Sequence, residues 1–130
     1  MKVAVWDTYV KRKNGNVLHF DIIVPESTKD AKLIYAYGTA YLTTKNEMEG
    51  ILATEECQFC HIEEPTEDML RAIKQTGFYI LEMEEIPSAL SENPTRREMI
   101  LYLRAHYPQY RFANFRGVGD ADIKGILKMV

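Results

Sequence analysis

The sequence has 130 residues, of which 46% are hydrophobic and 27% charged, as expected for one globular domain, or a domain with an appendage, that buries a core. This composition excludes an intrinsically disordered chain. The first ten residues alternate in polarity and lack the apolar block of a secretory signal, and no apolar run approaches membrane-spanning length, so we expect a cytoplasmic protein with no membrane partner.

Charge divides the chain into two parts. Residues 1–93 contain 9 Lys and Arg against 16 Asp and Glu, whereas residues 94–130 contain 7 against 3. The basic segment is therefore expected either to pack on the acidic part or to meet an anionic partner.

The first half of the chain predicts a hairpin followed by a helix. Lys2 to Val10 and Val17 to Val24 alternate like strands around the three-residue loop Lys13-Asn14-Gly15. Ser27 and Asp30 are spaced as in a capping box, and apolar residues at helical spacing predict a helix to about Lys45. A short third strand is expected at about residues 50–54, followed by a loop that contains the cysteines.

The next segment predicts a second helix and a fourth strand. Pro65-Thr66 begins the helix, Met69, Leu70 and Ile73 face inward, and Gly77 ends it. Phe78 to Met83 is the expected strand. The order ββαβαβ indicates a two-layer α+β domain in which a four-stranded, mostly antiparallel sheet carries the helices on one face.

Four stretches of sequence carry a resemblance. The stretches are DTYV in the first strand, LHFD in the second strand, EECQFCH and IKQTGFYILEME. Together they resemble a small bacterial family catalogued as domain of unknown function number two-thousand-and-twenty-four. The resemblance covers residues 1–86 and implies the same compact fold, and it implies no activity because the family has none assigned. Residues 87–130 are a basic helical extension, expected to pack on residues 1–86.

The hairpin register predicts a polar cluster. With a three-residue loop one face of the hairpin is apolar, and the other gathers Asp7, Tyr9, His19 and Asp21. Asp7 then lies opposite Asp21, and like charges in this position repel unless a cation, a proton or a base compensates them. A purely structural hydrogen-bonded surface is the alternative.

Both cysteines lie in Cys57-Gln58-Phe59-Cys60-His61. C-x-x-C-H is typical of c-type haem attachment, and C-x-x-C of a zinc half-site or a dithiol pair. A cytoplasmic location disfavours haem and a structural disulfide. Zinc needs about four ligands, so Cys57 and Cys60 would anchor the ion, with His61, His19 and Asp21 as partners. Inert thiols that pack the loop are the alternative.

No standard enzyme motif is found: the sequence lacks a P-loop, a G-x-S-x-G turn, H-E-x-x-H and a Rossmann glycine run. Cys60 with a histidine could form a nucleophile and base, which leaves a thiol-dependent enzyme as a third hypothesis. The first hypothesis is a small binding or regulatory module that holds zinc.

The sequence of the extension suggests a second hypothesis, which is nucleic-acid binding. Asn93 and Pro94 begin a third helix, which ends at Pro108, and the sequence that follows resembles the hairpin of a single helix-hairpin-helix motif. In that motif a glycine turn holds a DNA phosphate, and the candidate residues here are Arg111, Arg116, Gly117 and Gly119. Asp120 and Asp122 place negative charge at the same turn, so packing on the domain or on a second copy of the chain is favoured instead.

Overall fold

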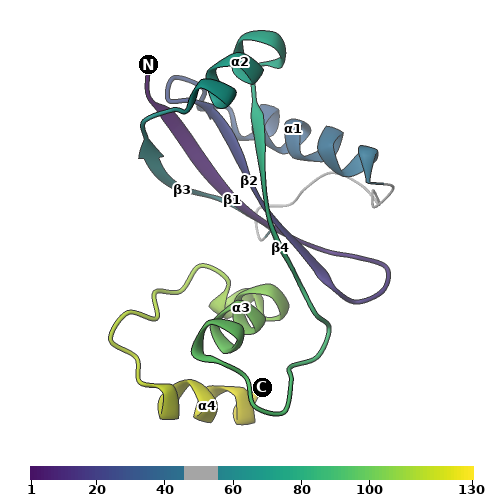
Figure 1. The fold of residues 1–130 in the computed structure, drawn as a ribbon, viewed down its shortest axis with the longest axis vertical. Coiled ribbons are helices and arrows are strands. Elements are labelled where there is room, and N and C mark those ends of the chain that lie inside the picture. Colours follow the sequence, from purple (N-terminus) through teal and green to yellow (C-terminus); the bar gives the residue numbers. More distant parts are fainter. Residues whose placement is uncertain (46–55) are drawn as a thin grey trace.

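A computed structural model describes residues 1–45 and 56–130 (Figure 1). Its elements are β1 (Val3–Lys11), β2 (Val17–Pro25), α1 (Ala31–Thr44), β3 (Cys57–Glu63), α2 (Glu67–Thr76), β4 (Tyr79–Ile86), α3 (Arg96–His106), the 3-10 helix η1 (Pro108–Tyr110) and α4 (Asp120–Met129). The strands form one sheet in the order β3-β1-β2-β4, with every neighbouring pair antiparallel. The α+β class and the antiparallel sheet are thereby confirmed.

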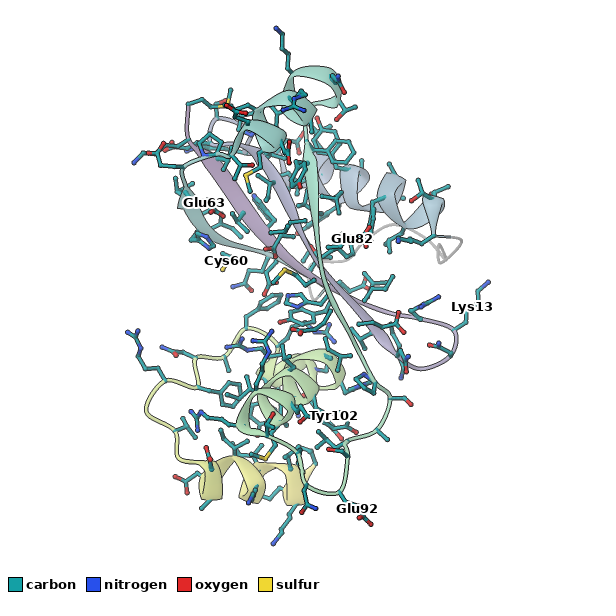
Figure 2. All side chains as sticks on the ribbon, viewed as in Figure 1. Lys13, Cys60, Glu63, Glu82, Glu92 and Tyr102 are labelled. Carbon is teal, nitrogen blue, oxygen red and sulfur yellow. The ribbon has the colours of Figure 1, made fainter. Side chains whose placement is uncertain are left out.

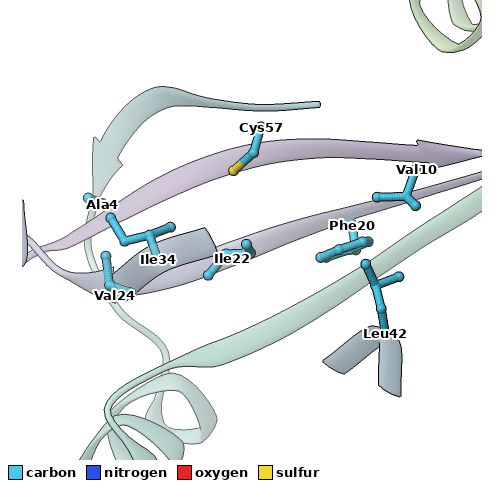
Figure 3. Packing of buried hydrophobic residues seen from close by; sticks show 8 residues of the cluster. All are labelled: Ala4, Val10, Phe20, Ile22, Val24, Ile34, Leu42 and Cys57. Carbon is cyan, nitrogen blue, oxygen red and sulfur yellow. The ribbon is translucent and has the colours of Figure 1, made fainter. Parts of the chain in front are cut away.

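Helices cover both faces of the sheet, so the expectation that they share one face was wrong. On one face Ile34 and Leu42 of α1 pack on even-numbered residues of β1 and β2 (Figure 3). On the other face Met69 and Ile73 of α2 pack on Val3, Val5 and Ile23. The alternation in the hairpin is incomplete, because the ends of both strands are apolar at odd positions as well. Each apolar face requires its own cover.

The two cysteines lie in a strand and not in the loop that the sequence predicted. Residues 57–63 pair with β1 as β3 and contain an irregularity, because Phe59 pairs with Trp6 while His61 pairs with Val5, which leaves Cys60 between them. β3 forms an outer edge of the sheet. The strand expected at residues 50–54 lies outside the described residues.

Helix ends follow local capping. Thr66 caps α2 through the Met69 N–H at 3.2 Å, and Gly77 ends it with φ 94° in the left-handed region. α3 begins after Thr95, whose hydroxyl accepts the Glu98 N–H at 3.1 Å, and not at Asn93 as expected. Leu70, expected to face inward, is 40% exposed.

The extension has its own small core and also covers part of the sheet. Met99 and Leu103 of α3 are buried against Ile123 of α4 and against Phe115, which lies between η1 and α4. Ala105 of α3 packs with Tyr9, Val17 and Ile86, at the opposite end of the sheet face from α2. Figure 1 shows α3 and α4 together beyond the end of β4. Within residues 1–45 and 56–130, no helix is long and apolar enough to cross a bilayer.

Candidate metal centre

A polar cluster occupies the sheet face between the apolar residues under α2 and those under α3. Asp7 pairs directly with Asp21 and Tyr9 with His19 across β1 and β2, which is the register that the hairpin loop predicted. The turn fixes this arrangement, because a register shift of one residue would place His19 and Asp21 on the opposite face from Asp7 and Tyr9.

The cluster is compact. His19 Nε2 lies 2.6 Å from Asp7 Oδ1, and one ligand atom from each of Asp7, His19 and Asp21 lies within 4.8 Å of the other two. The Tyr9 ring stacks on the His19 ring with a centroid distance of 4.2 Å and an interplanar angle of 6°. His19 is 9% exposed and Tyr9 is 1% exposed, so the stack fixes the imidazole plane within the protein.

Burial and a neighbouring negative charge raise the pKa values of Asp21 and Tyr9. Burial, followed by the negative charge of Asp7, raises the pKa of Asp21 to about 6, while the charges of His19 and His61 oppose this rise. A hydrogen bond with Asp7 also raises this pKa, so Asp21 takes up a proton as the pH falls through about 6. Burial and then Asp7 also raise the pKa of Tyr9 above its ordinary value.

The same region contains polar atoms without a hydrogen-bond partner among the described residues. They are His19 Nδ1 in the cluster and Arg104 Nε on α3 beside it. The Arg104 charge opposes the rise in the pKa values of Tyr9 and Cys60, which places its guanidinium near both. Buried polar atoms are usually satisfied, and unsatisfied ones concentrate at sites that bind a ligand, an ion or water.

The cysteines do not meet at this cluster. Cys57 is 2% exposed and packs in the core under α1, where the Thr8 hydroxyl donates to its sulfur at 3.3 Å. Cys60 is exposed on β3, at the edge of the sheet (Figure 2). Burial raises the pKa of Cys57 to about 11, and burial with the charge of Asp7 raises that of Cys60. Both thiols remain protonated at neutral pH, which disfavours a thiolate ligand or nucleophile.

His61 lies on the same strand, turned to solvent. Its Nε2 is 3.3 Å from Glu63 Oε1, and its side chain is 54% exposed. Among the described residues, Asp7, His19 and Asp21 are the one group of three or more His, Cys, Asp or Glu with ligand atoms this close. Of the metal ligands proposed from sequence, the structure therefore brings together His19 and Asp21, with Asp7, and leaves Cys57, Cys60 and His61 outside this group.

The nucleic-acid candidates are divided between core and surface. Arg111 is 9% exposed and donates to the carbonyl oxygens of Arg104 and Ala105 at 3.0 and 2.7 Å, so it caps the end of α3. Arg116, Gly117 and Gly119 are exposed, and Gly117 has φ 83°. The four residues therefore do not form one surface.

Arg104 was not among the residues predicted for the cluster. Its signal was present, because Arg96, Arg97 and Arg104 recur on the polar side of a helix whose other side is apolar. Only the packing of α3 over Tyr9 shows which of them faces the sheet.

Comparison with known proteins identifies residues 1–83 with the family model Domain of unknown function (DUF2024). The chain is also similar to the NMR structure of protein NE1680 from Nitrosomonas europaea, a target of the Northeast Structural Genomics Consortium, with 39% identity and a TM-score of 0.56. That match covers 65% of this chain and 96% of NE1680. No curated protein matches the sequence. The polar cluster and both cysteines lie within the matched residues, and α3 and α4 lie outside them.

Proposed function

We propose that this chain, which belongs to the DUF2024 family, is a binding module that holds a divalent metal ion on its sheet through Asp7, His19 and Asp21. The observation that carries the proposal is the convergence of two carboxylates and one imidazole, with ligand atoms within 4.8 Å, on a partly buried sheet face.

The ligand set suits zinc. Zinc takes imidazole nitrogen and carboxylate oxygen at roughly 2.0–2.2 Å, which places the ligand atoms of one ion about 3–4 Å apart. Small side-chain rotations bring the three atoms to that spacing from their present separations of at most 4.8 Å. Three protein ligands leave at least one position for water, so the centre would be of the open type.

A cation would also remove the electrostatic conflict of the site. Asp7 and Asp21 lie side by side on a partly buried sheet face, where two carboxylates repel. A divalent ion compensates both charges and competes with the proton that Asp21 takes up at low pH. Binding is therefore expected to weaken as the pH falls through about 6, where Asp21 regains its proton.

The decisive experiment is calorimetric titration of zinc into full-length metal-free protein at pH 7.5, compared with the variants Asp21→Asn and His19→Gln. One ion per chain is expected for the parent, with affinity reduced at least about a hundredfold in each variant, as for loss of one ligand of a few. His61→Gln is the matched control, because it removes an imidazole outside the group.

The outcomes separate the two metal hypotheses. If Cys60→Ser or His61→Gln abolishes binding while Asp21→Asn does not, the cysteine motif holds the ion and the sheet cluster does not. If the parent protein binds no zinc, the cluster is a hydrogen-bonded surface. Circular dichroism verifies that each variant is folded, and Asp21→Asn is expected to remain folded because it removes a repulsion.

A further inference from the structure

Four arginines line an open pocket of about 370 Å³ in the extension, and no acidic residue lines it. Arg96, Arg97 and Arg104 come from α3, and Arg116 from the segment between η1 and α4. The pocket lies outside the residues that match the family model. None of Asp7, His19 and Asp21 lines it, although Arg104 lies between the pocket and Tyr9 of the polar cluster, so a ligand of the arginines does not require the proposed metal ion.

Two of the arginines are held in place by the protein. Arg96 donates to Asp120 Oδ1 at 2.7 Å and to the Phe115 carbonyl oxygen at 3.0 Å. Arg104 donates to the Ala113 carbonyl oxygen at 3.1 Å, and its guanidinium lies 5.7 Å from the centre of the Phe115 ring. Neither guanidinium needs to be ordered when a ligand arrives, which lowers the entropic cost of binding.

The other two arginines leave donors available. Arg97 pairs with Glu84 at 2.6 Å on the exposed side of α3. Arg116 is exposed, and within the described residues its side chain makes no ion pair or hydrogen bond. Each guanidinium has five N–H donors in a planar fork, so most donors around the pocket have no protein acceptor.

The charge of the pocket identifies the chemistry of its ligand. Four guanidinium groups and the two carboxylates paired with them, Glu84 and Asp120, leave a net charge of 4 − 2 = +2. A phosphate monoester carries about −1.5 to −2 at pH 7 and offers three acceptor oxygens, whereas a single carboxylate carries −1 and offers two. The pocket thus matches a phosphate group in both charge and hydrogen bonding.

Apart from Asn114, the remaining wall of the pocket is apolar. Ile100, Leu101 and Phe115 line it beside the arginines. A volume of about 370 Å³ is at the small end of the range of ligand sites, which is roughly 300–1,000 Å³. We propose that this pocket binds a small phosphorylated molecule, with its phosphate on the arginines and its organic part against the apolar wall.

Titration calorimetry of the full-length protein at low salt tests the proposal with four probes: inorganic phosphate, glucose 6-phosphate, glucose and a short oligothymidine. Saturable binding of inorganic phosphate and glucose 6-phosphate is expected in the millimolar range or tighter, with none for glucose. Arg116→Gln should weaken both by about tenfold, as for loss of one charge-assisted hydrogen bond. Its side chain is exposed, so folding is not affected.

Lys128→Gln is the matched control, because it removes one positive charge from exposed α4 outside the pocket. If it weakens phosphate binding as much as Arg116→Gln, the effect is long-range electrostatics and the proposal is wrong. Absence of binding by both phosphate probes also overturns it. Binding of oligothymidine alone would instead make the extension a nucleic-acid surface. Amide shifts in α3 and residues 114–116 on phosphate addition would locate the ligand in the pocket.

Discussion

Residues 1–86 and residues 87–130 bury their apolar side chains in different ways. The first part buries both faces of a sheet, and its polar side chains meet between the apolar residues under α2 and those under α3. The second part buries one side of each of two helices around Leu103 and Ile123 and places arginines on the other side of α3. The two parts consequently collect opposite charge: carboxylates on the sheet and guanidinium groups on the helix.

This difference coincides with the limits of the family. The family model ends at residue 83, and NE1680 is matched over 96% of its length by 65% of this chain. The acidic cluster is therefore a feature of the part that the family shares, whereas the arginine pocket belongs to what this chain adds. Tyr9 connects them, because it stacks on His19 and packs beside Ala105 of α3.

The largest expected effect comes from matched core deletions in the two parts. Leu103→Ala in α3 and Ile34→Ala in α1 each remove a side chain that is 0% exposed, and each should cost about 3 kcal/mol of unfolding free energy. The single tryptophan, Trp6, lies in the sheet, so its fluorescence follows the first part during urea unfolding, while circular dichroism follows all helices.

If the two parts unfold separately, Leu103→Ala should lower the urea midpoint measured by circular dichroism more than the midpoint measured by Trp6 fluorescence. Ile34→Ala should lower both together. Equal shifts of the two midpoints in Leu103→Ala would show that the chain unfolds as one cooperative unit, so that the two parts would not differ in stability.

The next effect distinguishes the two cysteines. Cys57→Ser places a hydroxyl in an apolar core site and should cost about 1–2 kcal/mol, whereas Cys60→Ser on the exposed edge strand should change stability by less than about 0.5 kcal/mol. In a thiol titration of folded protein, Cys60 should react and Cys57 should react only after denaturation. Two thiols that titrate equally fast would contradict the burial of Cys57.

The smallest effect has the opposite sign, because Asp21→Asn should stabilise the metal-free protein. The pKa of Asp21 is about 6 in the folded chain, against about 3.9 for an unfolded aspartate. The stability that its proton provides is therefore present at low pH and is lost as the pH rises from about 4 to about 6. Asparagine cannot lose a proton, so the variant should gain about 1 kcal/mol above pH 6, after allowance for solvent screening.

Thermal unfolding at pH 4 and pH 7.5 measures this gain, which should appear only at the higher pH. Asp68→Asn is the control, since it makes the same change on exposed α2. A gain that is equal at both pH values would mean that Asp21 is not protonated in the folded protein. Together with loss of zinc binding, a gain at pH 7.5 alone would identify a site at which stability is lower because function requires both carboxylates.

Much of this protein was determined by its sequence because the relevant forces act over a few residues. The three-residue turn at Lys13-Asn14-Gly15 set the register that pairs Asp7 with Asp21. Thr66 and Gly77 marked α2 through hydrogen bonds that close within one turn of helix. The polar cluster could thus be predicted from the hairpin alone, since period-two alternation assigns every side chain to a face.

Tertiary structure decided what depends on partners far along the chain. Whether Cys57 and Cys60 form a loop or an edge strand depends on β1 offering a free edge, and their separation depends on a register irregularity opposite Val5 and Trp6. Whether α2 lies on the face of α1 or on the other depends on competition between two apolar faces. The arginine pocket depends on where the chain returns after η1 to place Arg116 beside α3. Such contacts gain their energy only after long loops close, and no local pattern encodes that closure.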